Sequence, residues 1–310
     1  MILCCGEALI DMIPSPTKAG ADGFVPHSGG AIFNTAIGLG RLGSPTGFLT
    51  GLSSDLFGKQ LQQDLAASNV DASFAISSDL PTTLAFVRLN KGHATYTFYD
   101  ENTAGRSLTP DVLPSLPEDI SALYFGGISL ISEPCADFYA ALAEQETKTR
   151  IIALDPNIRP SFIRDETRYR ARLSRMISAA DILKVSDEDL DWISPGSDPE
   201  NVKIAALLEQ GPSLIIITRG SSGASGFLAN GDQIDVPAPK ATVIDTVGAG
   251  DTFNSGVLNA LHTAGILEKT KLSAFTASSV KAALERGAEV AAVTVSRAGA
   301  NPPWAKELVK

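Results

Sequence analysis

Residues 245–253 have the sequence Asp-Thr-Val-Gly-Ala-Gly-Asp-Thr-Phe, and they join a β-like run to a helix-like run. The glycines at 248 and 250 permit a tight turn and let a ligand approach the backbone closely. The first N–H groups of the following helix have no partner inside that helix and carry partial positive charge, which attracts phosphate oxygens. Asp251 is placed to take a proton from a hydroxyl that attacks phosphorus. The stretch therefore predicts a phosphoryl-transfer site between a strand and a helix.

Asp251 has a second interpretation, because aspartate is also a favoured N-cap residue, and the motif alone does not decide between the two roles. Two better-known glycine motifs do not fit the sequence. A Walker A loop requires a lysine after its last glycine, whereas Gly250 is followed by Asp251. A dinucleotide-binding turn requires a small residue at the position of Phe253, whose ring would prevent close packing of helix and strand.

The composition is that of a globular protein, since 310 residues with 44% hydrophobic content suffice for one large domain or two. A net charge of −10 disfavours a nucleic-acid partner, which usually requires a basic face. Cys4, Cys5 and Cys135 have neither metal-site spacing nor a disulfide framework, which indicates a reducing, cytoplasmic setting. We expect Cys4 and Cys5 to be buried on opposite faces of one strand. Acidic Glu7 and Asp11 in the first apolar run disfavour a signal peptide, and no apolar run approaches the ~18 residues of a membrane span.

Short apolar runs alternate with segments of 3.6-residue periodicity, a pattern typical of a mainly parallel sheet with helices on both faces. The expected strands are residues 47–52, 123–126, 151–154, 182–185 and 214–218. The expected helices are residues 34–42, 57–68, 136–146, 169–179, 202–210, 252–264 and 273–286. We therefore predict an α/β fold with a Rossmann-type central sheet.

Two regions interrupt this alternation. Residues 12–28 are rich in proline, glycine and polar side chains, and residues 82–99 have the pattern of two strands joined by an Asn-Lys-Gly-His turn. We expect a small sheet across one edge of the main sheet, either as a lid that excludes water or as a homodimer surface. An ordinary surface decoration is the alternative. The predicted organisation is a large catalytic domain of residues 1–11, 29–78 and 105–310, with a β-sheet lid of residues 12–28 and 79–104.

Unusual polar and glycine residues follow several expected strands, at the sheet edge where parallel α/β proteins bind ligands. They are Asp11, Asp155, Asn157, Arg159, Lys184, Ser186, Thr218, Gly220, Gly223 and Asp245. Several have a plainer interpretation, with Asp11 as a turn residue and Arg159 as a partner of Asp155. Lys184 is either a nucleotide contact or a solvated strand end. The glycine turns either wrap phosphates through their N–H groups or simply end their strands.

Two segments together resemble the two signatures of the PfkB, or ribokinase-like, carbohydrate kinases. The first is Gly-Gly-Ala-Ile-Phe-Asn-Thr-Ala at 29–36 with Leu-Gly-Arg-Leu-Gly at 39–43, and the second is the stretch at 245–253. The similarity extends from residue 2 to residue 303. It implies a ribokinase-like fold with a β-sheet lid, ATP as phosphoryl donor, Mg²⁺ as helper and often a monovalent cation such as K⁺ near the second signature.

Residues 98–106, 155–160 and 184–189 look most like bacterial fructokinases. By this resemblance Asp251 is the base, and Gly248, Ala249 and Gly250 form the anion hole for the transferred phosphoryl group. The residues implied for sugar binding are Asp11, Gly29, Gly30, Asn34, Phe98, Arg159 and Asp251. Those implied for the ATP side are Lys184, Ser186, Thr218, Gly220 and Gly223, together with Gly248 and Gly250. Those implied for metals are Asp189, which would hold Mg²⁺ through water, and Asp245, Val247 and Gly299 for the monovalent cation.

The chain departs from the family pattern at two places. Where the family has Asn-x-x-Glu to organise magnesium, this chain has Ser-Asp-Glu-Asp at 186–189, so the shorter Asp189 must replace the glutamate. Where many fructokinases have Ser-Ala-Asp, this chain has Thr-Ala-Gly at 103–105. The second departure concerns which sugar binds, not phosphoryl transfer.

These features predict an ATP-dependent kinase that phosphorylates a free hexose, foremost D-fructose at its 6-hydroxyl. A 2-keto-3-deoxygluconate kinase is the nearest alternative, with Arg159 or Arg88 binding the substrate carboxylate. A catalytically silent sugar-binding regulator and a nicotinamide dehydrogenase are alternatives from other classes. The intact Gly-Ala-Gly-Asp sequence disfavours the regulator, and Phe253 disfavours the dehydrogenase.

Overall fold

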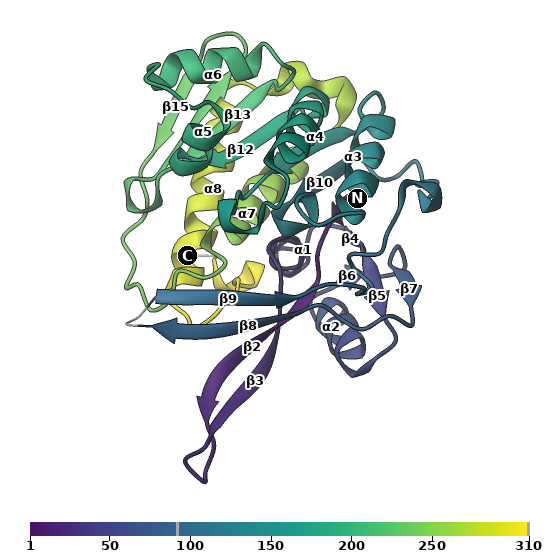
Figure 1. The fold of residues 1–310 in the computed structure, drawn as a ribbon. Helices are drawn as coiled ribbons and strands as arrows, with labels where there is room; N and C mark the ends of the chain where they lie inside the picture. Colours follow the sequence, from purple (N-terminus) through teal and green to yellow (C-terminus); the bar gives the residue numbers. More distant parts are fainter. Residues whose placement is uncertain (91–92, 309–310) are drawn as a thin grey trace.

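The computed structural model describes residues 1–90 and 93–308; the side chains of residues 88–90 and 93–95 are not among those described. Within these residues the main sheet has nine strands (Figure 1). From edge to edge they are β15 (Gln233–Val236), β14 (Ala224–Leu228), β13 (Leu214–Thr218), β12 (Ile182–Ser186), β11 (Ile151–Asp155), β10 (Ala122–Gly126), β1 (Ile2–Cys5), β4 (Thr46–Leu49) and β6 (Val70–Asp71). The strands from β13 to β6 run parallel, whereas β14 pairs antiparallel with both β13 and β15.

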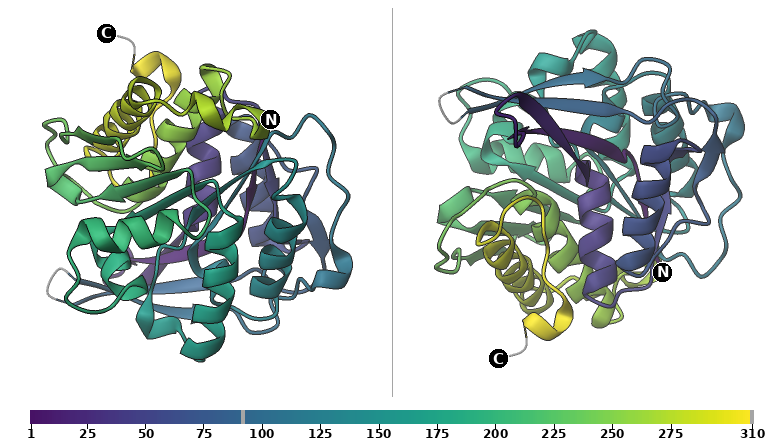
Figure 2. Two further views of the ribbon diagram at one scale, coloured as in Figure 1. Left: turned by 90° about the horizontal axis from the view of Figure 1, so that it is seen from above. Right: turned by 90° about the horizontal axis from the view of Figure 1, so that it is seen from below.

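Helices cover both faces of this sheet, as the two further views show (Figure 2). One core contains side chains of α1 (Ala31–Arg41), α2 (Leu56–Ala67), α7 (Ala249–Thr263) and α8 (Ala277–Val295). The other contains side chains of α3 (Cys135–Glu146), α4 (Glu166–Ala179), α5 (Asp187–Ile193) and α6 (Glu200–Leu208). Cys4 lies in the first core and Cys5 in the second, which confirms that they are buried on opposite faces of β1. The predicted ribokinase-like α/β fold is confirmed.

A second sheet, which we call the lid sheet, crosses the ends of the main strands (Figure 1). Its order is β3 (Asp22–Gly29), β2 (Leu9–Pro16), β8 (Leu84–Asn90) and β9 (His93–Tyr99). β2 pairs in parallel with β8, and the other two pairings are antiparallel. The turn residues Lys91 and Gly92 lie outside the described residues. β2 begins at Leu9, before the predicted lid boundary at residue 12, and the division into two domains stays a prediction.

The remaining elements are short. β5 (Gly51–Ser53) and β7 (Ile76–Ser78) form a parallel pair of their own. Short 3₁₀ helices are η1 (Pro110–Val112), η2 (Gly127–Leu130), η3 (Pro160–Phe162), η4 (Gly220–Ser222), η5 (Lys269–Ala274) and η6 (Ala305–Glu307). Along the described part of the chain, none of the helices has the length and apolar character needed to cross a membrane.

Three expectations about elements are wrong. The strand expected at 47–52 breaks at Thr50, and its two halves, β4 and β5, join different sheets. Residues 237–248 form no strand before the glycine motif, because Val243 and Ile244 are 62% and 65% exposed rather than packed in a sheet. The helix expected to end at residue 286 continues to Val295 through Gly287, where the absence of a side chain lets α8 approach the backbone oxygen of Phe253 in α7.

Candidate active site

A cavity of about 740 Å³ lies between the lid sheet and the carboxyl ends of the parallel strands. This is where ligands bind in open α/β sheets. The site residues predicted from the sequence that line this cavity are Asp11, Gly30, Asn34, Phe98, Arg159, Lys184, Val247, Gly248, Ala249, Gly250 and Asp251. The structure therefore brings the predicted sugar end and the predicted phosphoryl-transfer end into one cavity.

The glycine motif forms the first turn of α7. Gly248 is the N-cap residue with φ 75°, a left-handed conformation that favours glycine. A Cβ atom at this position would also stand 2.4 Å from the Cβ atom of Ala300. A helix that begins here directs its unpaired N–H groups and its positive dipole end at the cavity. The anion hole predicted for Gly248, Ala249 and Gly250 thus has the required local conformation.

Asp251 is 9% exposed in the first turn of α7 and does not cap the helix, because the N-cap is Gly248 and makes no side-chain cap hydrogen bond. Its Oδ2 atom accepts a hydrogen bond from Nδ2 of Asn34 at 2.9 Å. Its backbone oxygen accepts one from Oγ1 of Thr35 at 3.0 Å. Burial raises the pKa of Asp251 to about 7, with Asp155 and Glu7 adding to the shift while Asn34 and Lys184 oppose it. A carboxyl group with this pKa suits a general base near neutral pH.

The first signature places Asp11 and Asn34 on the wall of the cavity. Gly29 gives the Asp11 carboxylate its space, because a Cβ atom would stand 2.2 Å from Oδ2 of Asp11. Gly30 has φ 110°, and a Cβ atom there would stand 2.9 Å from the backbone oxygen of Glu7. We expected Asp11 to follow the first strand of the main sheet. It lies instead within β2 of the lid sheet. Burial raises the pKa of Asp11 to about 6.

Arg159 and Phe98 bound the cavity on its outer side. Arg159 is exposed at the residue before η3, and its Nη1 atom donates a hydrogen bond to the backbone oxygen of Ile158 at 3.0 Å. It does not pair with Asp155, which excludes the plainer interpretation of this arginine. Phe98 projects from β9 and packs edge-to-face on Phe162 of η3. The side chain of Arg88 lies outside the described residues.

Lys184 is buried at the base of the cavity and is not a solvated strand end. Its Nζ atom donates to Oδ2 of Asp155 at 2.9 Å, and Nδ2 of Asn254 donates to the same oxygen at 2.7 Å. Burial has the largest single effect and lowers the pKa of Lys184, but the charge and hydrogen bond of Asp155, together with the charges of Asp189 and Asp251, raise the pKa overall. The ammonium group also lies 3.5 Å from the position of a Cβ atom on Gly250. A fixed positive charge is therefore held beside the glycine turn.

Ser186 and Asp189 form a capping box at the start of α5. Oδ2 of Asp189 accepts from the N–H of Ser186 at 3.1 Å, and Oδ1 accepts from the N–H of Ile158 at 3.0 Å. Each oxygen retains a second lone pair, so the carboxylate can still accept a hydrogen bond from a metal-bound water. Neither residue lines the cavity, and the magnesium role of Asp189 stays a prediction.

Thr218, Gly220 and Gly223 lie at the end of the next strand and outside the cavity lining. Thr218 pairs in register with Ser186, so the predicted ATP residues continue from the cavity along the strand ends. Gly220 and Gly223 have φ values of 50° and 99° and form the turn of η4. Their nucleotide role stays a prediction.

Asp245, Val247 and Gly299, the residues predicted for a monovalent cation, lie close together and are joined by hydrogen bonds. Oδ1 of Asp245 accepts from the N–H of Val247 at 3.0 Å, and Oδ2 accepts from the N–H of Gly299 at 2.9 Å. The arrangement brings one carboxylate beside a bent backbone segment. Its use by a monovalent cation stays a prediction.

The sequence alone did not single out several residues of the cavity wall as site residues. They are Glu7, Tyr96 and Phe162. Glu7 accepts hydrogen bonds from the N–H groups of Ala31 and Ser129 and so ties α1 to η2. An acidic residue just after a fully apolar strand was a usable signal for Glu7. Phe162 had no such signal, because one phenylalanine in a loop does not differ from a core residue in sequence.

A buried carboxylate beside a glycine turn and a helix N-terminus, under a separate sheet, defines a phosphotransferase of the ribokinase-like type. The chain matches the family model described as pfkB family carbohydrate kinase over residues 1–307, and it belongs to that family. It is therefore an ATP-dependent carbohydrate kinase.

Known relatives of the chain include a fructokinase of Rhizobium leguminosarum bv. trifolii, which is 51% identical over 273 residues, covering 88% of this chain and 83% of that protein. The structure of a Xylella fastidiosa fructokinase with bound ATP superposes with a TM-score of 0.89 at 26% identity, covering 99% of this chain and 97% of the other. A Vibrio cholerae O395 fructokinase with fructose, ADP and calcium bound has a TM-score of 0.83 at 25% identity, covering 96% and 94%.

Proposed function

We propose that this protein is a fructokinase, which transfers the γ-phosphoryl group of ATP to the 6-hydroxyl of D-fructose. The observation that carries the proposal is the buried Asp251–Asn34 pair at the first turn of α7, in the same cavity as Asp11. The fructokinases among the relatives support fructose as the acceptor. The distinct Thr-Ala-Gly at 103–105 does not touch the cavity, so it does not oppose this acceptor.

The chemistry follows from the groups that surround the acceptor. Asp251 accepts the proton of the 6-hydroxyl while the oxygen attacks the γ-phosphorus of ATP, and the bond from that phosphorus to the oxygen of ADP breaks. The N–H groups at the start of α7 and the ammonium group of Lys184 neutralise charge on the transferred group. The lid sheet excludes water, which would otherwise compete for the phosphoryl group.

Magnesium, when bound, shields the phosphate charge and keeps several of its own waters. Asp189 fits a contact through such a water, since each of its oxygens has one free lone pair. Thr218, Gly220 and Gly223 would hold the nucleotide along the neighbouring strand ends, next to Ser186. Asp245, with the backbone at Val247 and Gly299, would hold a monovalent cation such as K⁺.

A 2-keto-3-deoxygluconate kinase is the second candidate. The observation that favours it is Arg159, an exposed guanidinium on the cavity wall with no carboxylate partner among the described residues. Such a group suits the carboxylate of a sugar acid.

The test is a substrate panel with purified protein, ATP and magnesium. Fructose, 2-keto-3-deoxygluconate, ribose, tagatose and nucleosides are compared by ADP formation, and the product is identified by ³¹P NMR. We expect fructose to have the highest kcat/KM. A preference for the sugar acid would support the second candidate, and ADP formation with none of the sugars would indicate a silent sugar-binding regulator. Failure to bind NAD in a titration would remove the dehydrogenase alternative.

We also propose a cytoplasmic homodimer that associates through the lid sheet. Free, buried cysteines at positions 4, 5 and 135 suit a reducing compartment. The lid sheet carries exposed aromatic side chains on the face opposite to Phe98, and exposed apolar surface of this kind suits association.

A further inference from the structure

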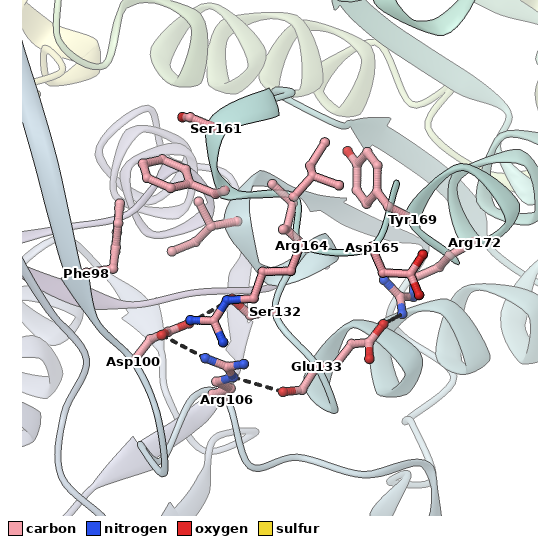
Figure 3. A pocket seen from close by; sticks show the side chains of 14 residues that line it. Phe98, Asp100, Arg106, Ser132, Glu133, Ser161, Arg164, Asp165, Tyr169 and Arg172 are labelled. Carbon is pink, nitrogen blue, oxygen red and sulfur yellow. Dashed lines mark hydrogen bonds and ion pairs between the residues drawn. The ribbon is translucent and has the colours of Figure 1, made fainter. Parts of the chain in front are cut away.

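A second cavity, whose lining is drawn in Figure 3, has a volume of about 280 Å³ and shares part of its wall with the active-site cavity. It is enclosed by the end of β9, the segment after η2, and the segment from η3 into α4. None of the residues 246–251 lines it, so phosphoryl transfer takes place on the other side of the wall that separates the two cavities.

Four residues line both cavities and therefore form the wall between them: Phe98, Ile128, Ser161 and Phe162. Phe98 and Phe162 make up the aromatic part of this wall, which we call the partition. Their ring centroids are 4.9 Å apart, and the rings meet edge-to-face at an angle of 80°. Phe98 comes from the lid sheet and Phe162 from η3, so the partition joins the lid to the main domain.

The arginines in the wall of the second cavity are paired with acidic residues. Arg106 donates to Asp100 at 2.8 Å, and Arg172 donates to Glu133 at 2.6 Å, as the dashed lines in Figure 3 show. These arginines are therefore not free to attract an anion. A neutral ligand with hydroxyl groups suits this mixture of paired charges and apolar side chains better than a charged one does.

One residue of this wall has a polar atom without a partner among the described residues. The hydroxyl group of Tyr169 is buried without a hydrogen bond to any described residue, and Tyr169 lines the second cavity. Because this hydroxyl group has almost no accessible surface, other atoms of Tyr169 form the cavity wall. The apolar side chains of Ile131 and Ile163 complete a surface of the kind that binds a sugar ring.

We propose that Phe162 determines acceptor size: it restricts the active site to a monosaccharide, and the second cavity behind it is a latent subsite for a neutral glycosyl group attached to the acceptor. This inference rests on the proposed fructokinase function. The chemistry is unchanged, since the 6-hydroxyl of the fructosyl unit still loses its proton to Asp251 and receives the γ-phosphoryl group as ADP leaves.

The test compares fructose with sucrose, a glucosyl fructoside whose fructose 6-hydroxyl is free. Phe162→Ala opens the partition, and we expect the ratio of kcat/KM for sucrose to that for fructose to rise by at least about tenfold, the lower range for altered contacts in an apolar pocket. Phe162→Leu, which preserves apolar packing, should give a smaller rise and keeps the test decisive if the alanine variant does not fold. Mass spectrometry identifies the sucrose phosphate formed.

The matched control is Ile163→Ala, because Ile163 lines only the second cavity and its removal leaves the partition intact. We expect this variant to retain the wild-type ratio. An unchanged ratio in folded Phe162 variants would overturn the inference, as would a wild-type enzyme that already phosphorylates sucrose as well as fructose. A wild-type enzyme inactive on fructose would instead contradict the proposed function, which separates the two failures.

Discussion

Asp251 combines two properties that are rarely found together on one carboxylate. It is almost fully buried, and it nevertheless faces a cavity large enough for a substrate. Burial raises its pKa to about 7, because the charged form loses its hydration. Its hydrogen bond from Asn34 partly offsets this loss and orients the carboxylate. The same environment thus orients the carboxylate that we propose as the base and adjusts its basicity.

Replacement of Asp251 by asparagine should lower kcat by at least the ~10² typical of a lost general base. The amide keeps the shape of the side chain and can still accept from Asn34, so folding and ATP binding should remain close to wild type. Steady-state kinetics and calorimetric titration with ATP measure the two effects. Asp198→Asn, at an exposed position, is the control and should have no effect. Near-normal turnover in the Asp251 variant would exclude its role as the base.

The pH dependence of kcat/KM should reflect the two raised carboxyl pKa values. A base is active when it is deprotonated, so kcat/KM should approach its maximum about one pH unit above the pKa of Asp251, should be halved near that pKa of about 7, and should fall further at lower pH. Protonation of Asp11, whose pKa is about 6, should weaken sugar binding further at lower pH. Kinetics from pH 5 to 9 measure this profile. A flat profile between pH 5 and 8 would contradict the assignment of Asp251.

At the scale of elements, a buried polar cluster around Asp155 links α7 to the sheet and joins two neighbouring strands. Asn254 in α7 and Lys184 in β12 both donate to the carboxylate of Asp155 at the end of β11. This cluster fixes the helix whose first turn carries Asp251. It also holds the ammonium group near Gly250, where a phosphoryl group would need it.

Removal of Asp155 should destabilise the protein strongly. Asp155→Ala leaves the buried ammonium group of Lys184 without a counter-charge, a change that costs about 3–5 kcal/mol. Urea unfolding measures the free energy of unfolding. The control is Glu285→Gln, which breaks the exposed pair with Lys281 and should cost less than about 1 kcal/mol. Equal losses in the two variants would show that the buried pair contributes no more than a surface pair.

The first turn of α7 should not tolerate a side chain at Gly248. Gly248→Ala combines a left-handed backbone with a contact of 2.4 Å to Ala300, so it should displace the turn and lower kcat by about 10²-fold. The control is Gly265→Ala. Gly265 also has a positive φ, of 69°, but the added methyl group would enter open space. This variant should lose only about 1–2 kcal/mol of stability and retain its kcat. If the two variants had comparable kcat values, the turn at Gly248 would have adapted to the clash.

At the scale of the whole molecule, the lid sheet has two different faces. Side chains alternate along β9, so Phe98 faces the cavity while Tyr99 faces away. Tyr99 packs edge-to-face on Phe86, which in turn packs on Phe24 of β3. Tyr99 and Phe24 are 61% and 44% exposed, and this aromatic row is the surface that we expect a second copy of the chain to cover.

A charge placed in this row should separate the proposed dimer. Tyr99→Asp would bury an unpaired carboxylate in the interface, so light scattering after size-exclusion chromatography should report a monomer. Val202→Asp introduces the same charge at an exposed position of α6, away from the lid sheet, and should leave the dimer intact. A wild-type monomer, or a dimeric Tyr99 variant, would contradict the proposed interface.

Local sequence determined a large part of this protein. The apolar runs of the parallel strands, the glycine turn at 248–250 and the carboxylate at Asp251 depend on backbone conformation and on near neighbours, which a single segment encodes. The predicted helices were all found for the same reason, although the end of α8 was not. The helix continues through Gly287 because Gly287 packs on α7, a contact that lies outside its own segment.

Only the tertiary structure decided which side chains act together. Asn34 and Asp251 are separated by 217 positions, and Lys184 and Asp155 by 29, and neither spacing reveals a hydrogen bond. The partition formed by Phe98 and Phe162 likewise depends on how the lid sheet meets η3. Burial, pKa and cavity shape arise from all elements that surround a group. The sequence by itself therefore determined the fold and the kind of chemistry, and the packing of distant elements decided the basicity of Asp251, the pairing of Lys184 and the limits of the acceptor site.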